Sequence, residues 1–142
     1  MKKLNLLTPK VEIDLINFTQ NLVRIKSVSG QEEEIIKFIE KKMKDIGYDK
    51  ITVDSMGNVV GRIGNGKNAI MFDSHIDTVD VKDEGEWDFP PFSGKIVDGN
   101  LWGRGSVDMK SGAAASIYAG AVAKNAGLDW MIACLPRVEV KL

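Results

Sequence analysis

The sequence contains very little histidine and cysteine, since His75 and Cys134 are the only residues of their kind among 142. A single cysteine has no partner for a disulfide within the chain, so we expect Cys134 to be a small buried apolar residue. No apolar run approaches the roughly 18 residues of a membrane-spanning helix. The 19 basic and 20 acidic residues nearly balance, unlike the basic surface of a nucleic-acid-binding protein. We therefore expect neither a membrane nor a nucleic acid as partner.

The N-terminal stretch "MKKLNLLTPKVEIDL" also lacks the features of a secretory signal. It opens with two lysines, but Pro9, Lys10 and Glu12 interrupt the apolar segment that a signal peptide requires. The sequence therefore predicts a cytoplasmic location.

Length and composition, with 44% hydrophobic and 27% charged residues, are typical of one globular domain or of a piece of a larger one. Apolar residues at helical spacing predict helices, and short apolar runs between turn residues predict strands. The expected helices span 11–26, 27–47 and 111–127, and the expected strands flank turns at 56–58 and 98–100 or lie within 68–79. This pattern indicates a layered α/β architecture.

Several local features of these elements follow from residue type. Ser29 or Gly30 is the expected cap of the helix over 27–47, and Ser111 is the expected cap of the last helix. Gly47 and Gly127 are expected to end the two helices. The strand within 68–79 begins with the continuous apolar run "AIMF", which predicts that it is covered on both faces.

The single histidine lies at the end of that strand, in "SHIDTVD". Side chains alternate along a strand, so His75 and Asp77 are expected to point the same way from its carboxyl end, where ligand sites gather in α/β sheets. A carboxylate that accepts the proton of one imidazole nitrogen leaves the other nitrogen free to bind a metal. The alternative is a histidine that ends the strand and forms only local hydrogen bonds.

A second stretch, "GRGSVDMKSG", places Asp108 directly before the expected last helix. Gly103 and Gly105 allow a tight backbone path that would bring this carboxylate into a crevice. The alternative is an ordinary acidic residue at a helix N-terminus, which contributes at most about 1 kcal/mol.

These stretches together resemble a known family. "SHIDTVDV" followed by "WDFPPFSGKIVDGNLWGRGSVDMKSG" is similar to the M20 family of dinuclear zinc aminoacylases and peptidases. That family includes acetylornithine deacetylases, succinyl-diaminopimelate desuccinylases and glutamate carboxypeptidases, and "GYDKITVDSMGNVVGRIG" most resembles its selenium-metabolism-linked hydrolase branch. The resemblance runs from residue 11 to Asp129, with His75 and Asp108 separated by the family's 33 positions.

The resemblance implies a role for each site residue. His75 corresponds to a histidine that binds one zinc, Asp77 to the catalytic-site carboxylate that orients it, and Asp108 to the aspartate that bridges two zincs. It also implies hydrolysis of the amide bond of a small peptide or N-acyl amino acid, with cobalt or manganese as substitute metals. It further implies a mixed sheet flanked by helices, and family members are often homodimeric.

The sequence departs from the family near its end. The family continues with a strand that ends in two acidic residues, a general base and a metal ligand, and later supplies a second histidine. Here Trp130–Leu135 is a candidate strand, but Pro136 follows it and Glu139 stands alone. We therefore expect residues 1–129 to be the N-terminal part of the catalytic domain and 130–142 to be a divergent tail. On this interpretation the lid or dimerisation domain is absent and the chain alone is inactive, and the alternative is a remnant or binding module without catalysis.

Two other signals have simpler interpretations. "GRIGNGKN", residues 61–68, nearly matches a phosphate-binding loop, but Asn68 replaces the required Ser or Thr, so a hairpin turn is expected. Trp87, Phe89 and Phe92 either line a substrate entrance or pack within their own loop.

Overall fold

A four-stranded mixed sheet is the centre of the molecule. The computed structural model describes residues 6–128 and 131–138. The strands are β1 (Lys50–Val53), β2 (Val59–Ile63), β3 (Ala69–His75) and β6 (Met131–Arg137). Their order is β1-β2-β6-β3, with β3 and β6 parallel and the other neighbours antiparallel. The predicted turn at 56–58 joins β1 to β2.

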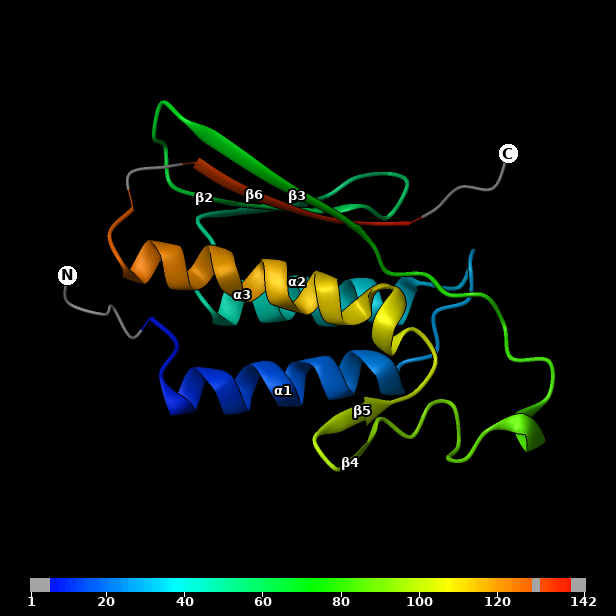
Figure 1. Cartoon of the computed structure of the whole chain (residues 1–142). Helices are drawn as coiled ribbons and strands as arrows, with labels where there is room; N and C mark the ends of the chain where they lie inside the picture. The colour runs from blue at the N-terminus through cyan, green and yellow to red at the C-terminus, as the bar shows by residue number, and fades with distance from the viewer. Residues whose placement is uncertain (1–5, 129–130, 139–142) are drawn as a thin grey trace.

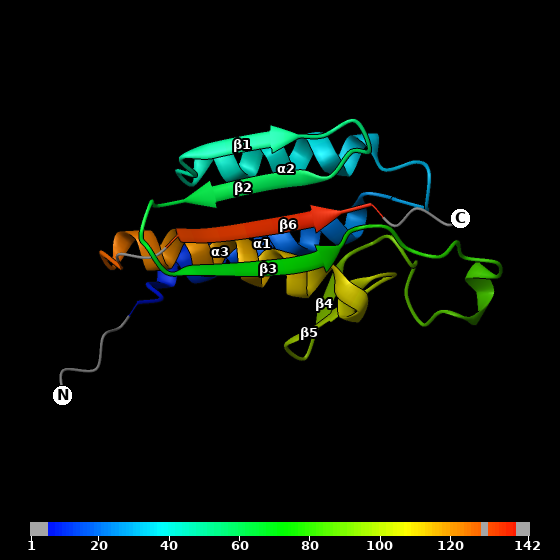
Figure 2. The same ribbon diagram turned by 90° about the horizontal axis from the view of Figure 1, so that it is seen from above.

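Three helices lie on one face of this sheet (Figure 1). They are α1 (Pro9–Arg24), α2 (Glu33–Asp45) and α3 (Ser111–Asn125). Helices α2 and α3 lie next to the sheet and α1 lies beyond them, so the sheet is in front when it is viewed from above (Figure 2). The predicted α/β fold, a mixed sheet flanked by helices, is confirmed. Within the described ranges, no helix is both long and apolar enough to cross a membrane.

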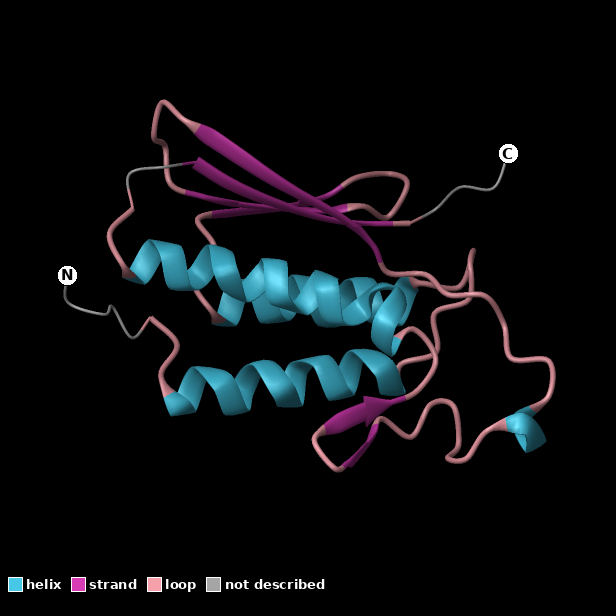
Figure 3. Ribbon diagram, viewed as in Figure 1, coloured by secondary structure: helices cyan, strands magenta, loops and turns pink. Residues whose placement is uncertain are grey.

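A separate hairpin lies near the C-terminal end of α1, on the side away from the four-stranded sheet (Figure 3). It consists of β4 (Lys95–Val97) and β5 (Asn100–Trp102), and its turn is the one predicted at 98–100. Asp98 and Gly99 have φ angles of 50° and 77°, which suit the tight turn of a two-residue hairpin.

The core between sheet and helices is centred on Tyr48. Its hydroxyl donates a hydrogen bond to the backbone carbonyl of Ile117 at 2.8 Å and lies 3.0 Å from Sγ of Cys134. A Cβ atom on Gly61 would lie 2.7 Å from Cδ1 of Tyr48, and one on Gly120 would lie 2.7 Å from its hydroxyl. Both glycines are therefore needed for this close packing. Cys134 is fully buried, as predicted.

The predicted cap of α2 is wrong. Neither Ser29 nor Gly30 precedes the helix directly; Glu32 does, and it makes no side-chain capping bond. The hydroxyl of Ser29 instead donates to the carboxylate of Asp77 at 2.6 Å. Ser29 therefore donates to a carboxylate 48 residues away in sequence instead of accepting from the N–H groups of the nearby helix.

The predicted cap of α3 is also wrong. Ser111 is the first residue of the helix, and its hydroxyl donates to the backbone carbonyl of Ser106. Ser111 has helical angles, φ −67° and ψ −40°, rather than the extended conformation of a capping residue, and Lys110, which precedes it, makes no side-chain capping bond. The predicted C-terminal ends of these two helices are confirmed: Gly47 and Gly127 follow α2 and α3 with φ angles of 88° and 71°.

The prediction that β3 is covered on both faces is wrong, because the three helices lie on one face of the sheet and, in the described part of the chain, the other face is open (Figure 1). Strand β3 also lies at an edge, where its neighbour among the described strands is β6. Ile70, Met71 and Phe72 remain 43%, 67% and 37% exposed. The apolar run is real, but the sheet order leaves it without a second neighbouring strand among the described residues.

Strand β6 lies in the middle of the sheet. The sequence predicted a strand over Trp130–Leu135, and the structure has it over Met131–Arg137, with Pro136 included. Pro136 lies beyond the residues of β6 that pair with β2, and it pairs in register with Ser74 of β3. Asp129, Trp130 and Glu139 lie outside the described residues.

Candidate functional site

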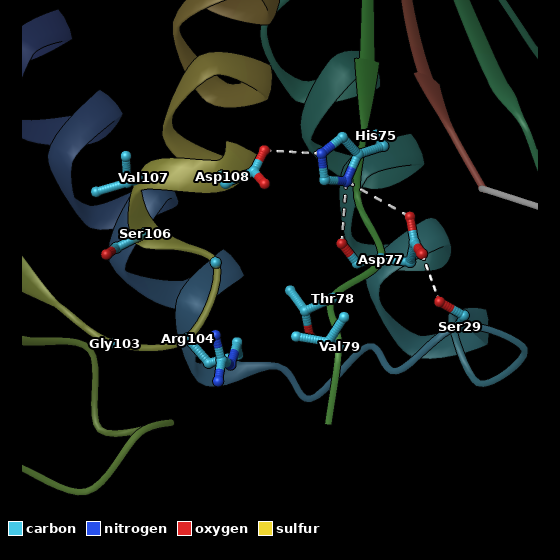
Figure 4. A pocket seen from close by; sticks show the side chains of 11 residues that line it. Ser29, His75, Asp77, Thr78, Val79, Gly103, Arg104, Ser106, Val107 and Asp108 are labelled. Atoms are coloured by element: carbon cyan, nitrogen blue, oxygen red, sulfur yellow. Dashed lines mark hydrogen bonds and ion pairs between the residues drawn. The ribbon is translucent and has the colours of Figure 1, made fainter. Parts of the chain in front are cut away.

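His75, Asp77 and Asp108 meet at the carboxyl end of β3 (Figure 4). His75 is the last residue of β3, Asp77 follows in the loop, and Asp108 lies at the kink in the segment Ser106–Lys110 before α3. Nε2 of His75 is 2.9 Å from Oδ1 of Asp108. The chain thus brings together two side chains that are 33 residues apart.

The other imidazole nitrogen faces Asp77. Nδ1 of His75 lies 3.1 Å from the backbone carbonyl oxygen of Asp77 and 3.5 Å from its Oδ1. The carboxylate is buried, and its Oδ2 accepts the hydrogen bond from Ser29. Asp77 therefore lies behind the imidazole as expected, but its carbonyl oxygen is closer to Nδ1 than its carboxylate is.

The loop that carries Asp77 is held by a short parallel pairing with the segment after α1. The hydroxyl of Ser27 donates to the carbonyl of Ile76 at 2.7 Å, and the N–H of Thr78 donates to the carbonyl of Ser27 at 2.8 Å. Val28 and Thr78 form a parallel bridge between the two segments. Ser29 is consequently placed beside Asp77, which the sequence did not reveal because a serine before a helix also suits a cap.

The segment that carries Asp108 is anchored by Lys110. The ammonium of Lys110 donates to the carbonyls of Leu22 at 2.9 Å and Ile25 at 2.7 Å, at the C-terminus of α1. Lys110 is fully buried, and burial lowers its pKa to about 8. The sequence contains no signal for this role, because buried lysines are rare.

Asp108 itself extends toward solvent. Its side chain is 85% exposed, whereas that of His75 is 25% exposed. The peptide bond between Asp108 and Met109 is cis. Gly105 precedes this segment with φ at 79°, and a Cβ atom there would lie 2.7 Å from Cγ2 of Thr78. The predicted tight glycine path is therefore present.

The two carboxylates influence the imidazole in a predictable direction. Burial lowers the pKa of His75, but the hydrogen bonds to Asp108 and to the backbone of Asp77 outweigh burial, and the pKa is raised above its usual value. In the metal-free site the imidazole thus lies between two acceptors that stabilise its charged form.

A pocket of about 460 Å³ contains the three residues. Its volume is in the range of small-molecule sites. The loop and turn residues around the three complete its lining, namely Ser29, Thr78, Val79, Gly103, Arg104, Gly105, Ser106 and Val107. Figure 4 shows most of these side chains around a common space.

The aromatic residues of the 85–94 loop have different surroundings. Phe89 packs against Trp102 of β5 with ring centroids 5.5 Å apart, and Phe92 lies under the ammonium of Lys26, which follows α1. Their partners therefore lie outside their own loop. Trp87 lines a hollow that adjoins the site pocket.

The residues present fit part of a metal site. An imidazole nitrogen and a carboxylate oxygen are donors that suit zinc. Oδ1 of Asp77 is buried with no hydrogen-bond partner among the described residues, which suits a carboxylate that receives the Nδ1 proton when Nε2 binds a metal. However, no group of three or more His, Cys, Asp or Glu side chains in residues 6–128 and 131–138 is arranged so that all of them could bind one metal ion. His75 and Asp108 would thus be two ligands of an incomplete set.

Comparison of the sequence with known proteins gives consistent matches. Residues 71–132 match the profile of peptidase family M20/M25/M40. The chain is 38% identical over 118 residues to the uncharacterized protein YgeY of Escherichia coli K12, covering 83% of this chain. It is 42% identical over 111 residues to a succinyl-diaminopimelate desuccinylase of Cereibacter sphaeroides, covering 75% of this chain. The chain spans 29% of the length of each of these relatives.

Comparison of the structure with solved structures agrees on the fold. An M20 family metallo-carboxypeptidase from Sulfolobus solfataricus superimposes with a TM-score of 0.77 at 22% identity. The match covers 90% of this chain and 30% of that protein. The predicted family resemblance is confirmed: this chain is related to peptidase family M20/M25/M40, and it matches the N-terminal part of the family's longer proteins.

Proposed function

We propose that this chain supplies part of the active site of a zinc-dependent hydrolase of amide bonds, acting on small peptides or N-acyl amino acids. His75 and Asp108 bind the metal, and Asp77 orients His75. The observation that carries the proposal is the 2.9 Å approach of Nε2 of His75 to Oδ1 of Asp108 inside a ligand-sized pocket. The names of the relatives, a desuccinylase and a metallo-carboxypeptidase, support both the bond type and the metal.

Each residue has a defined part in this proposal. Asp77, held by Ser29, accepts a hydrogen bond from Nδ1–H of His75 through its carbonyl oxygen or its carboxylate and so leaves the lone pair of Nε2 for the metal. Asp108 offers an exposed carboxylate that can bridge two ions, the number that the family resemblance implies. A zinc ion held by His75 and Asp108 would supply Lewis acidity for hydrolysis of the amide bond.

The same geometry leads us to propose that the 142-residue polypeptide is inactive by itself. A catalytic zinc takes about three protein ligands and a water. Hydrolysis also needs a general base, whose contribution is about 10²–10⁴-fold. Asp77 and Asp108 are the two carboxylates that line the described pocket, and both already have a role. The remaining ligands and the base must therefore come from residues other than the described ones.

A binding module without catalysis is the second candidate function. The observation that favours it is the lack of a third metal ligand in the described part of the pocket. Zinc affinity without turnover fits both candidates, whereas a folded chain without zinc affinity fits only the module.

The test measures zinc binding by calorimetry for the wild-type chain and for His75→Ala, Asp108→Asn and the control Glu34→Gln. Glu34 is an exposed residue of α2 that does not line the site pocket, so its substitution removes the same charge as Asp108→Asn without touching the site. We expect weak zinc binding that both site variants abolish and the control retains. Equal binding by His75→Ala would overturn the metal role.

The second measurement is an assay against a panel of N-acyl amino acids and dipeptides in the presence of zinc. We expect no turnover above background from this polypeptide. Turnover that disappears in His75→Ala would show that the chain is active by itself and would overturn the proposed inactivity.

A further inference from the structure

Arg104 is a second chemical feature of the pocket that contains His75 and Asp108. It lines that pocket and also the adjoining hollow that contains Trp87. Figure 4 shows Arg104 at the end of the pocket away from His75 and Asp108, with Thr78 and Val79 nearby. A ligand that spans the pocket would therefore meet the metal-site residues at one end and a guanidinium at the other.

The backbone on both sides of Arg104 is tightly constrained. Its N–H donates to the carbonyl of Pro91 at 2.7 Å. At Gly103, φ is 153° and a Cβ atom would lie 2.3 Å from Cγ1 of Val23. At Gly105, φ is 79°. Two glycines in these conformations hold the chain close to its neighbours, so Arg104 projects from a rigid turn rather than from a loose loop.

The guanidinium of Arg104 stacks on an aromatic ring but lacks a counter-ion. Its Cζ atom lies 5.0 Å from the ring centroid of Trp87, which covers one face of the cation. No carboxylate among the described residues is within 4.0 Å of it, although Asp83 and Glu86 line the adjoining hollow. Its Nε is buried and has no hydrogen-bond partner in the described part of the chain. An arginine is always charged, so a site of this kind favours an anion.

We propose that Arg104 binds the carboxylate of the ligand, with Trp87 holding the guanidinium in place. A guanidinium matches a planar carboxylate with two parallel hydrogen bonds. A singly charged planar group also suits this pocket better than a doubly charged phosphate, because Asp77 and Asp108 already line it. The inference rests on the proposed function, since it makes the bound molecule the substrate whose amide bond lies at His75 and Asp108.

The test compares an acid with its neutral amide on the metal-free chain. Binding of N-acetylglycine and of N-acetylglycine amide is followed by ligand-observed NMR. We expect saturable binding of the acid and at least about tenfold weaker binding of the amide, the loss typical of a charge-assisted hydrogen bond. Equal binding of acid and amide, or no saturable binding of the acid, would overturn the proposal.

Variants then assign the effect to Arg104. Arg104→Gln should weaken binding of the acid at least about tenfold, and Arg104→Lys should give an intermediate affinity because it keeps the charge but loses the two-pronged geometry. Lys67→Gln is the matched control, since Lys67 is an exposed cation just before β3, at the opposite end of that strand from His75. Unchanged affinity in Arg104→Gln would overturn the assignment.

A final variant separates this inference from the proposed function. His75→Ala should lose zinc binding and keep binding of N-acetylglycine in metal-free buffer, whereas Arg104→Gln should lose binding of N-acetylglycine and keep zinc. Failure of the zinc arm alone would overturn the metal role and leave the Arg104 site standing. Failure of the N-acetylglycine measurement alone would overturn the Arg104 site and leave the metal role of His75 standing.

Discussion

The hydroxyl of Tyr118 donates a hydrogen bond to Oδ2 of Asp14 at 2.5 Å and thereby joins α3 to α1. The ammonium of Lys42, from α2, lies 3.1 Å from the other oxygen of the same carboxylate. All three helices of the layer therefore meet at Asp14. The hydrogen bond from Tyr118 lowers the pKa of Asp14, and Lys42 lowers it further.

Asp14→Asn is expected to lower the free energy of unfolding by about 0.5–1 kcal/mol near neutral pH, a modest value because the carboxylate is 47% exposed. A carboxyl with a lowered folded pKa stabilises the protein above the usual aspartate pKa of about 3.9, and this stabilisation is lost as the pH falls through the folded pKa. The difference between wild type and variant should therefore shrink in acid. Urea unfolding at neutral and acidic pH measures it, and Tyr118→Phe should flatten the same pH dependence. A pH-independent difference would contradict this account.

Lys110→Met is expected to destabilise the chain by about 2 kcal/mol. The methionine fills a similar volume but leaves the carbonyls of Leu22 and Ile25 without their donor, and an unsatisfied buried acceptor costs about 1–3 kcal/mol. Thermal or urea unfolding measures the change. Lys124→Met is the control, because Lys124 also donates to a carbonyl, that of Gly47, but at an exposed position. Equal effects of the two substitutions would argue against a special role for Lys110.

Ser29→Ala is expected to reduce zinc affinity about tenfold without unfolding the chain. Loss of the hydroxyl releases Oδ2 of Asp77, and residues that hold a metal-binding histidine in place typically contribute this much. Calorimetric titration with zinc measures the effect. Ser55→Ala, at an exposed turn position, serves as the control. Unaltered affinity in Ser29→Ala would show that Asp77 is held by other contacts.

Met71→Lys is expected to reduce self-association of the chain when it is expressed alone. An exposed apolar edge strand invites pairing with another chain, and a lysine on such a strand opposes it. Met71 is 67% exposed on β3. Light scattering as a function of concentration compares it with Met56→Lys, which places the same charge in the β1–β2 turn. A wild-type chain that stays monomeric and melts cooperatively would contradict the expectation.

Much of the fold follows from local sequence patterns. The helix ends at Gly47 and Gly127 and the tight turn at Asp98 need only residue-level preferences, because they depend on φ angles that few residues adopt. The family resemblance likewise rests on short motifs, and the comparisons confirm it. The spacing of His75 and Asp77 predicts that both lie on one side of the strand end, since alternation along a strand is a local property.

Other features depend on which segments become neighbours, and no local pattern contains that information. The apolar run of β3 predicts burial, but the helices cover one face of the sheet and leave Met71 exposed on the other (Figure 1). Ser29 suits a helix cap equally well, and the pairing of its segment with the loop after β3 makes Asp77 its partner. Asp108 reaches His75 only because Lys110 and two glycines fix the turn before α3 against distant residues.

The sequence alone therefore determined the elements and the candidate residues. Their partners were decided by tertiary packing, because a hydrogen bond or an apolar contact forms with whatever the folded chain brings within reach.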